Sequence, residues 1–472
     1  MKHVILGAGP AGVIAAETLR KHAPLDDIVV IGDEPEPPYS RMAIPYLLIG
    51  KVGEAGTYLR RDADHFAKLR ITLQRGRVQA LDVQRRSVTL EDGSSVAFDK
   101  LLIATGSSPA SPPIPGIDGP GVHPCWTMQD ARAIMALAQP GARVLQMGAG
   151  FIGCIIMEAL ATRGVKLSVV EMGDRMVPRM MGPTAGGMIK DWCESKGVTV
   201  FTGARVEAIE RPAAAAAAAA PASPAAASPP EPGLLGKIAR ALVFDDPPAA
   251  APVPATAVAP AATAPMRVRL STGQQLDADL VISATGVKPN IGFLKDSGVT
   301  CLVGVLTDEH LQTNVAGIYA AGDCAEAFDK VSGITIVSAI QPNAAEQARV
   351  AALNMAGHVT SLKGVTQINV LDTLGLISAS FGQWQGVPGG EQVELSNPAA
   401  GKLLSLQFSG DRLVGCNAIG WTEHVGVMRG LVEGQVRLAG DWKQRLLADP
   451  TLLMEAYLAN AQGQQAMAHV KG

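Results

Sequence analysis

Two glycine-rich motifs carry the spacing in this chain that points most directly to chemistry. They are GAGPAG at residues 7–12 and GAGFIG at residues 148–153. In a G-x-G-x-x-G turn the first glycine permits the tight turn, the second lets the backbone approach a pyrophosphate, and the third lets the following helix pack on the strand. The pyrophosphate lies on free N–H groups at the helix start, where aligned peptide dipoles favour negative charge. Two such turns predict two dinucleotide cofactors on one polypeptide.

An acidic residue follows each motif at the spacing that a ribose contact requires. IVVIGDE places Glu34 at the end of the next strand in the first unit, and LSVVE places Glu171 in the second. Both lie about 20 residues beyond the glycines, where a carboxylate accepts hydrogen bonds from a ribose diol. A carboxylate at this point repels a 2'-phosphate, so Glu171 favours NAD over NADP.

The residues around both motifs predict the elements that would hold them. Apolar runs precede the motifs, HVIL in the first case and RVLQM in the second, and alanine-rich helical stretches follow. Two later segments, 100–109 and 279–290, each contain a strand that ends in Ala-Thr-Gly, where we expect the chain to cross between domains. An apolar strand at 313–326 closes on Gly322 and Asp323. One motif alone also fits an ordinary glycine-rich turn. Two motifs with strand–turn–helix flanks predict an α/β fold with two Rossmann-like nucleotide-binding domains.

Length, charge and hydropathy exclude other classes of protein. A chain of 472 residues is too long for one hydrophobic core and should divide into about three domains. The net charge of -3 gives no electrostatic basis for binding nucleic acid. No uninterrupted apolar stretch has the roughly 18 residues of a membrane span. We expect the first strand to begin at residue 3 or 4, which leaves no room for a signal peptide. We therefore expect a cytoplasmic location.

The six cysteines are far apart, and none has C-x-x-C spacing. We therefore predict no metal or iron–sulfur site in this chain. In a reducing compartment the default role of each cysteine is a small buried hydrophobe. Cys154 lies directly after the second glycine motif, where a redox role is the alternative, but packing at the start of a helix is the favoured interpretation.

Residues 212–265 break the composition of the chain, with eight alanines at 213–220 and repeated Ala, Pro and Ser. This composition predicts a flexible or extended linker. The sequence before it indicates two strands, and the sequence after it indicates strand, turn and strand, so the insertion is expected to replace a hairpin tip. Within it, GLLGKIARALVF at 233–244 has apolar residues near helical spacing. A docking helix for a partner and a transient helix without one are equally compatible with this pattern.

The order of the motifs, GAGPAG, ATG, GAGFIG, ATG and GD, resembles the FAD-dependent pyridine nucleotide-disulfide oxidoreductase superfamily over residues 1 to about 357. The segments at 371–382 and 414–421 are similar to the C-terminal domain of the flavin unit of nitrite reductases, whose usual role is dimerisation and covering the flavin face. The resemblance implies three domains. Residues 1–113 and 284–357 would form an FAD-binding domain, and residues 114–283 an NAD-binding domain that contains the 212–265 insertion. Residues 358–472 would form a C-terminal α+β interface domain.

The resemblance also assigns residues to the two cofactors. Glu34 would hold the adenosine half of FAD, Arg41 would meet its pyrophosphate, and Asp323 would bond the ribityl chain. The helix at 341–357 would point its N-terminus at the flavin pyrimidine edge, where its dipole favours negative charge. The set implied for FAD is Gly7, Gly9, Pro10, Ala11, Gly12, Asp33, Glu34, Arg41, Val78, Ala104, Thr105, Gly106, Gly322, Asp323, Pro342 and Asn343. The set implied for NAD is Gly148, Gly150, Phe151, Ile152, Gly153, Glu171, Ala284, Thr285 and Gly286.

The segment after Glu34 decides the subfamily. Pro-Tyr-Ser-Arg at residues 38–41 resembles an element of ferredoxin and rubredoxin reductases and of the flavin domain of assimilatory nitrite reductases. The related coenzyme A disulfide reductases have a cysteine where our alignment places Met42. A thioether cannot become a thiolate, so reduction of a disulfide or a peroxide through a cysteine is not expected.

The chain departs from the superfamily pattern at two positions beside flavin N5. Ile155 stands where the superfamily usually has a glutamate, and our alignment gives Tyr46 in place of its lysine partner. Losing both is physically consistent, because one buried charge left alone would cost several kcal/mol. Hydride transfer needs stacking and orientation, and the flavin supplies the chemistry. We therefore expect reaction at flavin N5 beside Met42, Tyr46 and Ile155, with no certain catalytic side chain.

The leading expectation is an enzyme that exchanges a hydride between NAD(H) and flavin N5 and single electrons with an iron–sulfur partner. The partner is a ferredoxin, a rubredoxin, or the cluster subunit of a larger complex such as an aldehyde oxidoreductase or nitrite reductase. One alternative is an NADH oxidase that forms peroxide, and another is a non-catalytic FAD-binding assembly subunit or redox sensor. A homodimer and a hetero-oligomeric complex both remain open.

Overall fold

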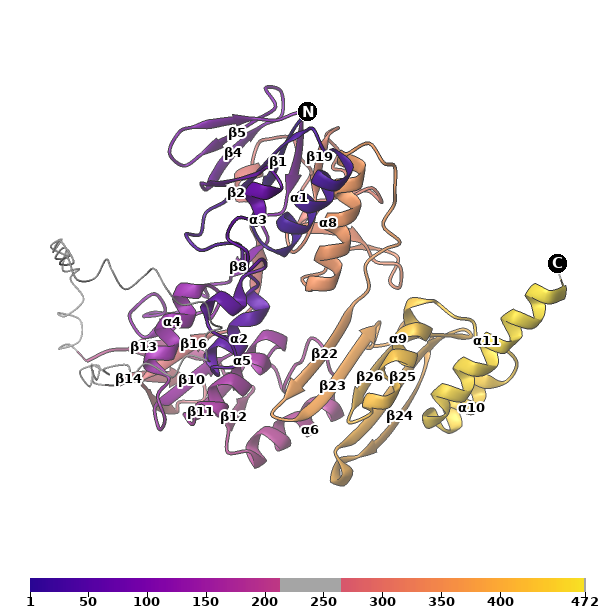
Figure 1. Cartoon of the computed structure of the whole chain (residues 1–472). Helices are drawn as coiled ribbons and strands as arrows, with labels where there is room; N and C mark the ends of the chain where they lie inside the picture. The colour runs from indigo at the N-terminus through magenta and orange to yellow at the C-terminus, as the bar shows by residue number, and fades with distance from the viewer. Residues whose placement is uncertain (213–264, 471–472) are drawn as a thin grey trace, which may run out of the picture.

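The computed structural model describes residues 1–212 and 265–470. The predicted helix at 233–244 lies outside these residues. Two α/β units and an antiparallel C-terminal sheet with its own helices make up the described chain (Figure 1). The predicted fold class, with two Rossmann-like cores and a C-terminal α+β region, is confirmed. The exact domain boundaries stay predictions.

The first unit is built on a parallel five-stranded sheet in the order β19-β7-β1-β2-β3. One face packs on helices and the other on a small antiparallel sheet, and burial on both faces explains the unbroken apolar runs of the strands. Because β19 and α8 come from far along the chain, two separate segments assemble this unit (Figure 1). Its elements are β1 (Lys2–Leu6), α1 (Pro10–His22), β2 (Asp27–Gly32), α3 (His65–Lys68), β3 (Ile71–Arg75), β4 (Val78–Asp82), β5 (Ser87–Leu90), β6 (Ser95–Ala97), β7 (Lys100–Ile103), β19 (Ile318–Ala320) and α8 (Gln341–Met355).

The second unit repeats this layering. Its parallel sheet has the order β12-β11-β10-β16-β9, with helices on one face and an antiparallel sheet, β13-β14-β15, on the other. Its elements are β9 (Val122–His123), α4 (Met128–Leu137), β10 (Arg143–Met147), α5 (Phe151–Thr162), β11 (Lys166–Glu171), α6 (Pro183–Ser195), β12 (Thr199–Thr202), β13 (Val206–Glu210), β14 (Met266–Leu270), β15 (Gln275–Ala278) and β16 (Leu280–Ser283). β13 and β14 pair antiparallel, with Glu210 opposite Arg267, which confirms that a hairpin flanks the insertion.

The two units are joined by a ribbon of two short strands. β8 (Ser107–Pro109) follows the first Ala-Thr-Gly, β17 (Val287–Pro289) follows the second, and the two strands pair antiparallel. Both crossings predicted from the Ala-Thr-Gly signals are therefore present and lie side by side. The short strands β18 (Val305–Leu306), β20 (Ala325–Phe328) and β21 (Thr335–Val337) form a further small sheet beside β19.

The segment after β2 leaves the first unit and packs into the second. It contains α2 (Ile44–Leu48), whose buried side chains Ile44, Leu47 and Leu48 belong to the same hydrophobic core as α4 and α5. Figure 1 shows α2 beside α4 and α5 rather than beside the first sheet. Residues early in the chain therefore complete the core of the second unit.

The C-terminal region is an antiparallel sheet in the order β22-β23-β26-β25-β24. One face packs on three helices, and apolar residues of the other face join the core that contains α5 and α6. This contact buries α5 between sheets, which fits its almost wholly apolar sequence. In the described part of the chain, no helix has the length and hydropathy to cross a bilayer. The elements are β22 (Ile368–Thr373), β23 (Leu376–Gly382), β24 (Glu391–Asn397), β25 (Lys402–Ser409), β26 (Arg412–Ile419), α9 (Val425–Glu433), α10 (Trp442–Ala448) and α11 (Leu453–Val470).

Candidate functional site

The first glycine motif forms a turn between β1 and α1 that is open above its second glycine. Gly7 has φ +113°, and a side chain there would collide with the Ala104 carbonyl. A side chain on Gly12 would collide with the Gly7 carbonyl, whereas one on Gly9 would meet nothing within 4 Å. Gly9 is the N-cap of α1 and offers no side-chain cap to the free N–H groups. The open space at an uncapped helix start fits a pyrophosphate.

The second glycine motif repeats this geometry between β10 and α5. Gly148 has φ +93°, and a side chain there would collide with the Ala284 carbonyl, while one on Gly153 would stand 2.6 Å from the Gly148 oxygen. Gly150 again has nothing within 4 Å and caps α5 without a side-chain hydrogen bond. Phe151 and Ile152 form the first turn of the helix. The residues of both turns therefore fit the groups that the sequence predicts.

The two predicted ribose acids have different surroundings. Glu171 accepts hydrogen bonds from the backbone N–H groups of Ala149 and Gly173, both at 2.7 Å. Glu34 instead accepts from the Tyr39 hydroxyl at 2.5 Å and from Arg41 Nη2 at 2.6 Å. Burial, followed by the hydrogen bond to Glu34, raises the pKa of Tyr39 well above its ordinary value, so Tyr39 remains a donor. Arg41, predicted to face the pyrophosphate, is thus paired with the predicted ribose acid.

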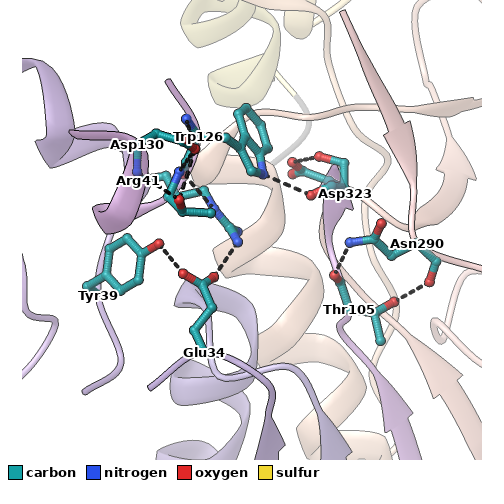
Figure 2. Close-up of polar contacts among 10 residues, drawn as sticks. Glu34, Tyr39, Arg41, Thr105, Trp126, Asp130, Asn290 and Asp323 are labelled. Carbon is teal, nitrogen blue, oxygen red and sulfur yellow. Dashed lines mark hydrogen bonds and ion pairs between the residues drawn. The ribbon is translucent and has the colours of Figure 1, made fainter. Parts of the chain in front are cut away.

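Arg41 and Asp323 are linked through Trp126, a residue that sequence reasoning missed. Arg41 Nε donates to the Trp126 carbonyl at 3.1 Å, and the guanidinium carbon lies 5.3 Å from the centroid of the indole ring. Trp126 Nε1 donates to the Ser107 carbonyl at 3.1 Å, and Ser107 Oγ donates to Asp323 Oδ2 at 2.9 Å. Figure 2 shows Glu34, Arg41, Trp126 and Asp323 in this succession. Burial raises the pKa of Asp323, while Ser107 and Arg41 oppose the shift.

The Ala-Thr-Gly residues lie at the start of the ribbon between the units. Thr105 Oγ1 donates to the Asn290 carbonyl at 2.7 Å, and Asn290 Nδ2 donates to the Thr105 carbonyl at 3.0 Å (Figure 2). Thr285 Oγ1 donates to the Ala110 carbonyl at 3.1 Å. Gly106 and Gly286 both have positive φ and open space where a side chain would stand. The reciprocal hydrogen bonds of Thr105 and Asn290 hold the two segments that connect the units, 104–109 and 284–290, against each other.

The remaining predicted FAD residues take several roles. Gly322 has φ +82° and donates its N–H to Gln347 Oε1 at 2.7 Å, a contact with no local sequence signal. Pro342 lies in the first turn of α8, whose N-terminus has no side-chain cap, and Asn343 Nδ2 donates to Ser338 Oγ and the Thr366 carbonyl. The other members lie on or next to elements of the first unit: Pro10 and Ala11 open α1, Asp33 directly follows β2, and Val78 begins β4.

The three residues expected beside flavin N5 lie on α2, on the short turn before it, and on α5. The side chains of Met42 and Tyr46 are 50% and 54% exposed, although Ile44, Leu47 and Leu48 on the same segment are buried. Ile155 is partly buried and packs on the core that α2 also joins. Two exposed apolar side chains one helical turn apart form a surface that a planar ring can cover.

All six cysteines are free, and five of them are buried. Burial raises the pKa of Cys125 and Cys193 to about 12 and raises that of Cys154 further. Cys154 Sγ faces the Ala149 carbonyl at 3.8 Å inside α5, which agrees with the packing interpretation. Within residues 1–212 and 265–470, no group of three or more His, Cys, Asp or Glu is placed to hold a metal ion.

Comparisons with known proteins agree with this geometry. The family described as pyridine nucleotide-disulphide oxidoreductase matches residues 1–220 and 254–352. The chain is 30% identical over 453 residues to NADH-dependent phenylglyoxylate dehydrogenase subunit epsilon of Aromatoleum evansii, covering 95% of each protein. It is 28% identical over 323 residues to the biphenyl dioxygenase system ferredoxin–NAD(+) reductase component of Paraburkholderia xenovorans, covering 68% of this chain and 66% of that protein. The solved covalent putidaredoxin reductase–putidaredoxin complex shares the fold with a TM-score of 0.80 and 22% identity, covering 98% of this chain and 99% of that one.

Proposed function

Because the chain belongs to the pyridine nucleotide-disulphide oxidoreductase family, we propose that it moves a hydride between NAD(H) and FAD and exchanges single electrons with an iron–sulfur partner. It is an FAD-dependent oxidoreductase that uses NAD(H). The observation that carries the proposal is the repeated glycine turn, open above its second glycine in both units. Bound flavin supplies the conversion between two-electron and one-electron transfer.

In this proposal the first unit binds FAD through groups at the carboxyl edge of its sheet. The N–H groups at the start of α1 hold the pyrophosphate above Gly9. Glu34 accepts from the adenosine ribose while Tyr39 and Arg41 continue to fix its carboxylate. Asp323 faces the ribityl chain, and the uncapped N-terminus of α8 faces the electron-accepting ring. These groups bind and orient the cofactor, and none of them needs to change its covalent state.

The second unit binds NAD(H) in the same manner. The start of α5 holds its pyrophosphate above Gly150, and Glu171 lies at the end of β11, where the ribose is expected. The two backbone hydrogen bonds to Glu171 hold its carboxylate in place, and a carboxylate at this position disfavours a 2'-phosphate. We propose NADH rather than NADPH as the donor for this reason.

The surroundings of the expected flavin ring favour electron transfer to a partner over chemistry at a protein thiol. Our alignment matches Met42 to the cysteine of related disulfide reductases. Burial raises the pKa of Cys125 and Cys193 to about 12, which disfavours their thiolates. A relative named as a ferredoxin–NAD(+) reductase component supports an iron–sulfur acceptor. A relative named as a subunit of an NADH-dependent dehydrogenase supports a complex of several subunits. We propose a ferredoxin, a rubredoxin or a cluster-bearing subunit as this acceptor, in a homodimeric or hetero-oligomeric assembly. Docking through 233–244 remains a prediction.

Anaerobic stopped-flow mixing with NADH tests the hydride step. The visible flavin absorbance should bleach within seconds if kcat is about 1 per second or higher, and NADPH should act much more slowly. The second step is tested by adding oxidised ferredoxin or rubredoxin to the NADH-reduced protein and comparing the return of flavin absorbance with that in dissolved oxygen alone. Faster return with the iron–sulfur protein supports the proposal. No bleaching by NADH would overturn it in favour of the non-catalytic alternative, and fastest return with oxygen would favour the oxidase.

A further inference from the structure

Two carboxylates that mark opposite parts of the expected FAD site are joined by one succession of side chains. Glu34 lies at the expected adenosine ribose and Asp323 at the expected ribityl chain. Between them stand Arg41, Trp126 and Ser107, each in direct contact with the next (Figure 2). Trp126 is the member of this succession that comes from the segment leading into α4 of the second unit.

Trp126 is held in place by the start of α4. Its backbone N–H donates to Asp130 Oδ2 at 3.1 Å, and the neighbouring Thr127 N–H donates to the same oxygen at 2.8 Å. Thr127 Oγ1 accepts from the Asp130 N–H at 3.1 Å, which completes a capping box. Met128, directly after this pair, is fully buried. The indole is therefore presented by a fixed backbone rather than by a free loop.

Arg41 is oriented from two sides. Glu34 takes a hydrogen bond from Nη2, while Trp126 takes one from Nε through its carbonyl and places its ring beside the guanidinium. A guanidinium has five N–H groups, and in the described residues only these two hydrogen bonds use them. The other N–H groups remain available to an anion, and arginine matches phosphate oxygens in a planar geometry.

We propose that Trp126 is a positioning residue for FAD. Its ring and carbonyl orient the Arg41 guanidinium toward the FAD pyrophosphate, and its indole N–H holds Ser107, which in turn holds Asp323. The inference rests on the proposed function, because it assumes that FAD lies along Glu34, Arg41 and Asp323. It adds that the second unit contributes to binding the flavin cofactor, through a residue with no expected contact to NAD(H). The affinity for FAD then depends on how the two units are held together.

The test measures FAD affinity on apoprotein, by quenching of flavin fluorescence, together with the unfolding temperature of the apoprotein. Trp126→Leu removes the ring and the indole N–H and should weaken FAD binding about tenfold. Trp126→Phe keeps a ring beside Arg41 and should restore part of the affinity. In an Arg41→Met background, Trp126→Leu should cause a clearly smaller further loss, because only its hydrogen bond to Ser107, and through it the Asp323 contact, is left to lose.

Trp192 provides the matched control. Its indole N–H donates to the carbonyls of Thr373 and Leu374 at 3.1 Å, and Lys196 lies 4.3 Å from its ring centroid, so it also ties two regions together beside a cation. Trp192→Leu should lower the unfolding temperature without changing FAD affinity. Equal FAD affinity in wild type and Trp126→Leu, or an undiminished loss in the Arg41→Met background, would overturn the proposal. If the wild-type apoprotein binds no FAD at all, the proposed function itself fails, which is a distinct result.

Discussion

Replacing Gly150 by alanine should weaken NADH binding at the second glycine turn without destabilising the fold. Gly150 has extended backbone angles, φ -77° and ψ -171°, and an added methyl group would meet no atom within 4 Å. The protein should therefore fold normally and gain about 0.4–1 kcal/mol from reduced freedom of the unfolded chain. The methyl group would, however, occupy the space expected for the NAD pyrophosphate.

The loss in affinity follows from the contacts that the methyl group would disturb. A hydrogen bond to a charged acceptor contributes about 1.5–3 kcal/mol, so displacing the pyrophosphate from one N–H at the start of α5 should weaken NADH binding by roughly ten- to a hundredfold. The assay is NADH titration of the FAD-loaded variant, together with its unfolding temperature and flavin content. Flavin content should not change, because the first glycine turn is untouched.

Gly153 supplies the contrasting variant. A methyl group on Gly153 would stand 2.6 Å from the Gly148 oxygen and 2.9 Å from Gln146 Nε2, so Gly153→Ala should destabilise the fold by about 1–3 kcal/mol. NADH affinity equal to wild type in Gly150→Ala would refute the placement of the pyrophosphate above this glycine. A large drop in its unfolding temperature would refute the claim that the space is open.

Three further outcomes are expected. Asn417→Ala should lower the unfolding temperature, because Asn417 is 3% exposed and forms hydrogen bonds with two backbone groups of the 180–182 turn. Each of these backbone groups would cost about 1–3 kcal/mol when left unpaired. An unchanged unfolding temperature would contradict this. Burial lowers the pKa of His3 from its ordinary 6.5, although the hydrogen bond to Asp26 opposes the shift. Below about pH 6.5 the unfolded chain therefore binds a proton that the folded protein does not yet bind, and the free energy of unfolding falls. The fall in unfolding temperature between about pH 7 and pH 5 should be shallower in His3→Leu, and parallel curves would reject the assignment to His3. Deleting 213–264 should leave flavin content and NADH reduction unchanged, because β13 and β14 stay paired; loss of flavin would argue against an insertion at a hairpin tip.

The glycine turns and the crossings could be predicted from sequence because their signals are local. A positive φ, a close backbone approach and a helix start all fall within a few residues of Gly7 and Gly148, and the Ala-Thr-Gly ends mark both crossings. The α4 capping box was equally readable from Thr127 and Asp130, and would have placed Trp126 at the head of a helix.

The contacts that assemble the site from distant segments could not be predicted in this way. Arg41 meets Trp126, and Gly322 meets Gln347, across parts of the chain with no shared periodicity. The ion pair between Arg41 and Glu34 also escaped the sequence interpretation, which assigned each to a separate part of FAD. Such contacts depend on how the sheets are brought together, and one sequence contains no pattern that specifies this.

Because α2 is buried in the core of the second unit, the two nucleotide-binding units are expected to unfold together as one cooperative unit. Separating them would expose Ile44, Leu47 and Leu48, at about 1.5–3 kcal/mol for each side chain. A fragment that stops near residue 113 would carry this apolar helix without its cover and would be prone to aggregate. The intact chain should therefore melt in a single calorimetric transition across both units.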